Sequence, residues 1–165
     1  YKKEGNEQFK NKNYNEAISL YNIGIEKLEE SMTSYDPKIQ NENMKILVKS
    51  IIEEKVNVLS NMSTCYLKLE NYQQVFNLDM SIIRQFNPVW DKSYNRIIIA
   101  CIKNNDLMMA NQYAQILKMQ FSQDIVEKYK GTFEDLENEN KNHLESIKKK
   151  KNQEESECES TLIKD

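Results

Sequence analysis

The sequence contains little glycine or proline, only three and two of its 165 residues. Turn-rich β-sandwiches and barrels use both residue types at many turns, so this composition disfavours them. No apolar run approaches the ~20 residues that a membrane-spanning helix requires. With 39% hydrophobic and 30% charged residues, the composition is instead typical of a soluble helical domain with one core.

Groups for catalysis and metal binding are also sparse. The one histidine, His143, falls on the polar half of a predicted helix, and no glycine-rich phosphate loop or nucleophile–histidine set is present. The cysteines lack metal-ligand spacing, because Cys65 and Cys101 occupy apolar helix positions and Cys158 lies in a polar segment. We therefore expect no enzyme activity, no metal and no cofactor, and reduced structural thiols in a cytoplasmic protein.

The charge of the chain excludes some partners. A net charge of −3 predicts no general attraction to nucleic acid, and basic and aromatic residues are not interleaved as they are in many nucleic-acid-binding proteins. Residues 148–151 are four lysines, a run that could touch a membrane or an acidic partner but is more typical of a solvated helix end. We expect no membrane association and a monomer. Because Tyr1 already lies inside a periodic pattern, we also expect the sequence to be a fragment.

Three segments share one pattern of a helix, a short polar turn and a second helix. They span residues 2–25, 58–83 and 91–117. Small residues at helix-contact positions predict close antiparallel packing. These residues are Gly5 and Ser63 in the first helices and Ala17 and Ala110 in the second, with Tyr14, Tyr72 and Leu107 at one equivalent place after the turn. The pattern resembles the tetratricopeptide repeat (TPR), which implies an all-α superhelix of three helix-turn-helix repeats.

The resemblance also implies a domain organisation. We expect the repeats at about 1–32, 37–86 and 91–119 within residues 1–121. Asp36 and Pro37 are typical of a helix N-terminus, which predicts two lengthened helices joined at 33–36, similar to those of large immunophilins. We expect Ser122 to cap a long C-terminal helix over 122–150 that covers the third repeat. Residues 151–165 form a polar tail that we expect to be disordered.

Candidate binding residues follow from the curvature of stacked repeats, whose first helices line a concave groove. Lys2 and Asn6 are i,i+4 neighbours, as are Lys92 and Arg96, and Asn61 comes from the first helix of the second repeat. No acidic residue falls on the predicted inner face. Three adjacent helices would therefore aim cationic and amide donors at one small volume, which suits a ligand with carboxylates.

These five residues resemble, one by one, the carboxylate clamp of TPR co-chaperones, in the contexts KKEGN, SNMSTCY and WDKSYNR. The resemblance implies binding of the C-terminal Glu-Glu-Val-Asp peptide of a heat-shock chaperone. The lysines and asparagines would hold the terminal carboxylates, and the arginine would reach an upstream peptide group. We expect secondary groove contacts from Phe9, Lys10, Thr64, Leu67, Lys68 and Ile99.

Two questions stay open at this point. The same fold could serve as a scaffold or docking receptor for a different peptide client. The peptide could come from either the ninety- or the seventy-kilodalton chaperone, and the lengthened, immunophilin-like helices favour the ninety-kilodalton one.

Overall fold

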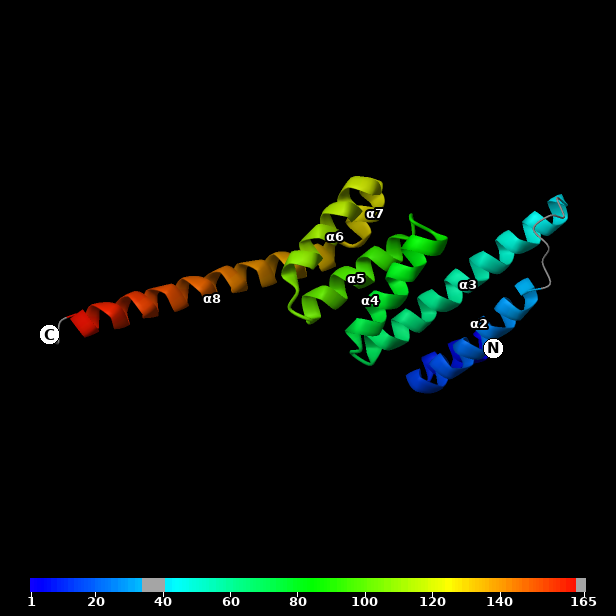
Figure 1. The fold of residues 1–165 in the computed structure, drawn as a ribbon, viewed down its shortest axis with the longest axis horizontal. Coiled ribbons are helices and arrows are strands. Elements are labelled where there is room, and N and C mark those ends of the chain that lie inside the picture. Colours follow the sequence, from blue (N-terminus) through cyan, green and yellow to red (C-terminus); the bar gives the residue numbers. More distant parts are fainter. Residues whose placement is uncertain (34–40, 163–165) are drawn as a thin grey trace.

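The computed structural model of the chain describes residues 1–33 and 41–162, and no β-strand occurs within them. Their elements are α1 (Lys2–Lys10), α2 (Tyr14–Thr33), α3 (Glu42–Lys68), α4 (Tyr72–Ser81), the π-helix η1 (Ile82–Phe86), α5 (Asp91–Lys103), α6 (Leu107–Gln120), α7 (Gln123–Lys128) and α8 (Lys130–Leu162). The described part is an all-α, TPR-like superhelix, as predicted (Figure 1).

The turns inside the three helix pairs have the same backbone geometry. Each contains one residue with a positive φ, namely Lys12, Glu70 and Asn105. These positions are 58 and 35 residues apart, the same spacing as the sequence repeats. In each turn the following residue, Asn13, Asn71 or Asp106, donates its backbone N–H to a carbonyl five residues earlier, closing the end of the first helix. The equivalent turns confirm the register of the three repeats.

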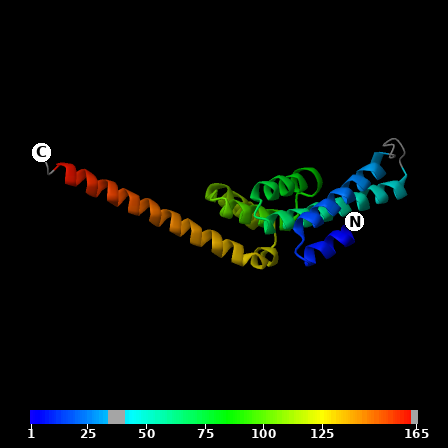
Figure 2. The same cartoon turned by 90° about the horizontal axis from the view of Figure 1, so that it is seen from below.

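The helices form two layers. Each helix from α1 to α6 packs on its neighbour in sequence, and the first helices of the pairs also contact one another, α1 with α3 and α3 with α5. Figure 1 and Figure 2 show α8 extending from this body as a long separate arm. The contacts between first helices place α1, α3 and α5 side by side as an inner layer.

Small residues allow the close approach of α1 and α2, as predicted. Gly5 is buried, and a Cβ added there would lie 2.5 Å from the Tyr21 ring. Ala17 and Ala110 are also completely buried at the equivalent place in α2 and α6. In the second repeat Val75 fills that place and is equally buried, so the larger side chain fits within the core.

The second repeat is lengthened on its N-terminal side. Helix α2 continues to Thr33, and α3 begins at Glu42, where the side chain of Asn41 accepts a hydrogen bond from the backbone N–H of Asn43. The predicted helix start at Asp36 and Pro37 lies outside the described residues. The long α2 and α3 are joined across their exposed halves by an ion pair between Lys55 and Glu29, with 2.6 Å between Nζ and Oε1.

The C-terminal segment differs from the single helix that we predicted. It is divided at Tyr129, whose φ of −106° and ψ of 17° end α7 before α8 begins. The Tyr129 hydroxyl donates to Asp91 of α5 at 2.7 Å, which anchors the break on the third repeat. Leu136 then buries its side chain in the core cluster of α5 and α6, so the start of α8 covers the third repeat as predicted. The backbone of α8 continues to Leu162, through most of the tail for which we predicted disorder.

Candidate ligand-binding groove

A pocket of about 410 Å³ lies on the inner face between the first and second repeats. It is lined by Asn6, Phe9, Lys10, Tyr21, Asn61 and Thr64. Five of these six are residues that the sequence predicts for the groove, and only Tyr21 was not among them. Residues 55 positions apart, Asn6 and Asn61, therefore meet at one site because α1 and α3 are adjacent inner helices.

Asn6 is the centre of a small hydrogen-bond network in this pocket. Its Oδ1 accepts from the Tyr21 hydroxyl at 2.6 Å and from Asn61 Nδ2 at 3.0 Å. Tyr21 is only 1% exposed, and burial raises its pKa to about 12. The hydroxyl therefore stays protonated near neutral pH and can act as the donor in this bond.

Lys2 lies one turn before Asn6 on α1 and is held by an acidic residue. Its Nζ is 2.8 Å from Oε2 of Glu54 on α3, with the two side chains 36% and 41% exposed. We expected no acidic group on the inner face, so Glu54 is a correction to that expectation. A partly exposed pair of this kind contributes only about 0.2–1 kcal/mol, so an incoming carboxylate can compete for Lys2.

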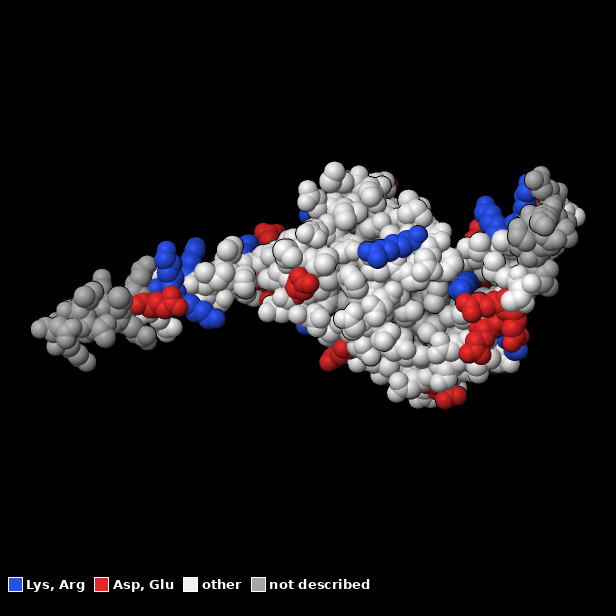
Figure 3. Space-filling view, in the orientation of Figure 1, with Lys and Arg blue, Asp and Glu red and all other residues white. Residues whose placement is uncertain are grey.

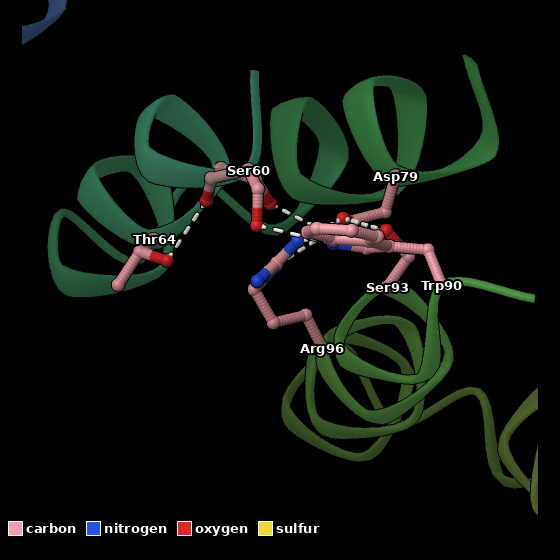
Figure 4. Close-up of polar contacts among 7 residues, drawn as sticks. Ser60, Thr64, Asp79, Trp90, Ser93 and Arg96 are labelled. Carbon is pink, nitrogen blue, oxygen red and sulfur yellow. Dashed lines mark hydrogen bonds and ion pairs between the residues drawn. The ribbon is translucent and has the colours of Figure 1, made fainter. Parts of the chain in front are cut away.

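Lys92 is exposed at the start of α5. Its Nζ lies 5.8 Å from the centre of the Trp90 ring, within the distance at which a cation is attracted to an aromatic face. Trp90 in turn donates from Nε1 to Ser60 Oγ at 3.4 Å (Figure 4). Trp90 also packs on the cluster that contains Val56 and Ile82. Lys92 is therefore placed next to the inner face of α3 by a half-buried tryptophan.

We expected Arg96 to lie free in the groove, but the structure shows it buried. It is 7% exposed, and its Nε and Nη2 bind Oδ2 and Oδ1 of Asp79 at 2.9 and 2.5 Å. Ser63 and Ser93 also donate to the fully buried Asp79 carboxylate, at 2.5 and 2.6 Å. Figure 4 shows the Arg96 guanidinium directed at this carboxylate. The cluster links α3, α4 and α5, so Arg96 stabilises the packing of these helices.

The other predicted groove residues lie outside the 410 Å³ pocket. Leu67 and Ile99 are half-buried, and Lys68 is exposed. Within the pocket Phe9 packs on the Tyr14 ring at 5.4 Å between centroids, and Lys10 pairs with Glu7 at 3.1 Å. The structure thus brings the N-terminal half of the predicted site together more closely than its far end.

Tyr21 and Asp79, which sequence reasoning did not assign to the site, occupy one equivalent repeat position. Tyr21 follows Ala17 by four residues, and Asp79 follows Val75 by four. The first lies beside Asn61 and the second beside Arg96, which are themselves equivalent residues of α3 and α5. A polar group at the buried i+4 position of α2 and of α4 was the signal in the sequence.

The two described cysteines and the histidine lie outside the pocket lining. Burial raises the pKa of Cys65 and that of Cys101 to about 11, so both thiols are protonated and unreactive near neutral pH. His143 is exposed, as predicted. Across residues 1–33 and 41–162 there is no cluster of three potential metal ligands, and no helix there is long and apolar enough to span a membrane.

The surface charge is uneven. Figure 3 shows acidic side chains gathered over the region of α2, whose sequence includes Glu26, Glu29 and Glu30. The pocket residues, in contrast, are amide, basic, hydroxyl and aromatic. The lining of the pocket therefore carries no acidic side chain.

Comparison with known proteins gives one informative similarity. No protein-family model matches the chain. Heat shock protein STI1 of Saccharomyces cerevisiae is 30% identical over 124 residues, which are 74% of this chain and 17% of STI1. The similarity and the repeated helix pairs fit a TPR domain. The chain corresponds to a small part of STI1, so the similarity concerns one region of that protein.

Proposed function

We propose that this domain is a protein-interaction module of a co-chaperone that binds the free C-terminus of a heat-shock chaperone ending in Glu-Glu-Val-Asp. The pocket between α1 and α3 is the observation that carries the proposal. It combines two asparagine amides with Lys10 and lies beside Lys2. The similarity to a heat shock protein supports a chaperone partner.

The hydrogen-bonding state of the pocket favours an anionic ligand. Asn6 Oδ1 already accepts two hydrogen bonds, so the Asn6 groups that remain for a ligand are its N–H donors. A terminal aspartate brings two carboxylates to such donors, and each charge-assisted hydrogen bond contributes about 1.5–3 kcal/mol. After the cost of association, a few such bonds suit a Kd near 1 μM, about −8 kcal/mol.

Four of the five clamp residues have donors that are free or displaceable, namely Lys2, Asn6, Asn61 and Lys92. Arg96 completes the clamp in the resemblance, but its bonds to buried Asp79 hold it inside the protein. Upstream peptide contacts would then come from Phe9, Thr64, Leu67 and Ile99. We favour the ninety-kilodalton chaperone because α2 and α3 are lengthened in the manner of large immunophilins.

The alternative is a TPR scaffold for a different peptide client, and the engaged Arg96 is the observation that favours it. Calorimetric titration with the peptide Met-Glu-Glu-Val-Asp separates the two. The clamp requires micromolar binding that weakens as salt rises, because the attraction is between partly exposed charges. Absence of binding at millimolar peptide would leave the scaffold as the better description.

Replacing Glu54 with glutamine should strengthen peptide binding about two- to fivefold. In the free protein Glu54 forms an ion pair with Lys2. Its carboxylate therefore competes with the carboxylate of the peptide for Lys2 and also repels it. Titration of Glu54→Gln with the same pentapeptide measures the effect. The matched control is Glu53→Gln, which makes the same change at the exposed neighbouring residue. Equal gains in the two variants would show that only net charge, and no specific competition for Lys2, is involved.

A further inference from the structure

The network around Asn6 has a feature that the clamp resemblance does not include. Tyr21 comes from an outer helix, is almost completely buried, and directs its hydroxyl into the pocket from behind Asn6. Its ring is fixed by Gly5, which leaves no space for a Cβ. The hydroxyl is therefore held in place by packing on the opposite side from the ligand.

Two donors identify which end of the Asn6 amide faces the groove. The hydroxyl of Tyr21 and Nδ2 of Asn61 both point at Asn6 Oδ1. The oxygen is thereby turned towards the protein, and Nδ2 must point the other way because the amide group is planar. The structure shows no hydrogen bond from Asn6 Nδ2 to any described residue, so both of its protons remain for a ligand.

We propose that Tyr21 is a positioning residue that sets the Asn6 amide as a donor towards the bound carboxylate. This inference rests on the proposed function. Without the hydroxyl, Oδ1 of Asn6 keeps only the hydrogen bond from Asn61 Nδ2. A 180° rotation of the Asn6 amide, which presents Oδ1 to the groove where it repels a carboxylate, then becomes easier. Asp79, at the equivalent position of α4, holds Arg96 in the same way. One repeat position thus determines which polar groups of the inner layer a ligand meets.

The test is Tyr21→Phe, which keeps the packed ring and removes only the hydroxyl. We expect about tenfold weaker binding of Met-Glu-Glu-Val-Asp, the size of one weakened charge-assisted hydrogen bond. Binding of the C-terminally amidated peptide should change much less, so the preference for the free acid falls. The control is Tyr14→Phe, since Tyr14 makes no hydroxyl hydrogen bond within the described residues and packs on Phe9 of the same pocket.

Two further measurements separate orientation from general stability. In the Asn6→Ala background, Tyr21→Phe should add no further loss of binding, because its effect passes through Asn6. The variant Asn6→Asp keeps an acceptor for Tyr21 and lacks the donor, so it should also lose free-acid binding even if Tyr21→Phe does not fold. An unchanged free-acid preference in Tyr21→Phe, or full binding by Asn6→Asp, would overturn the inference. Wild-type protein without any free-acid preference would overturn the proposed function, and this inference with it.

Discussion

Replacing Asp79 with alanine should destabilise the domain by about 3–5 kcal/mol, the usual cost of breaking a buried ion pair. The substitution removes the acceptor of both Arg96 donors and of Ser63 and Ser93. The Arg96 charge is then left at 7% exposure without a partner. Because the cluster joins three helices, we expect the second and third repeats to lose their packing together.

Urea denaturation followed by circular dichroism measures this loss. The matched control is Asp135→Ala on the exposed side of α8, which should change the free energy of unfolding by less than about 0.5 kcal/mol. A loss of similar size in both variants, or none in Asp79→Ala, would show that the Asp79 cluster does not hold the helices together as described.

Reversing the charge of Lys92 should weaken peptide binding by about a hundredfold or more without unfolding the domain. In Lys92→Glu, a carboxylate takes the place of the ammonium that we propose faces the ligand, so attraction becomes repulsion. Lys92 is exposed, and its charge lies over the face of Trp90, so we expect a change in Tm of no more than a few degrees.

The same titration with Lys148→Glu provides the control for net charge. The substitution Lys148→Glu makes the same change of charge on the exposed part of α8, away from the pocket. A comparable loss in both variants would indicate long-range electrostatics instead of a defined site. Retention of micromolar binding by Lys92→Glu would remove Lys92 from the site.

The repeat architecture was predictable because its signals are local. Each repeat can be recognised within one chain segment, from its turn residues and its small residues at helix contacts. The repeats are spaced by 58 and 35 residues, and the turns at Lys12, Glu70 and Asn105 have the same two spacings. The division between α7 and α8 was not predictable in this way. It depends on Tyr129 reaching Asp91, 38 residues away in sequence, and a hydrogen bond of that range leaves no periodic pattern.

The inner-helix residues of the candidate pocket could be predicted from the sequence, but the groups that hold them could not. Asn6 and Asn61 meet as the repeat geometry requires. In contrast, Asp79 and Glu54 are acidic residues on amphipathic helices, where a carboxylate is usually solvated. Only the packing of α4 against α3 and α5 shows that Asp79 is buried and binds Arg96. The partners of a charged side chain depend on the tertiary structure and cannot be identified from the local sequence.

If the groove recognises a chain terminus, amidation of the ligand must weaken its binding. The wild-type domain is titrated with Met-Glu-Glu-Val-Asp and with its C-terminal amide, two peptides that differ only in one carboxylate. We expect the free acid to bind at least about tenfold more tightly, a difference of about 1.4 kcal/mol. Equal affinity for the two peptides would contradict it, and the domain would then be a TPR scaffold that binds its partner by other features.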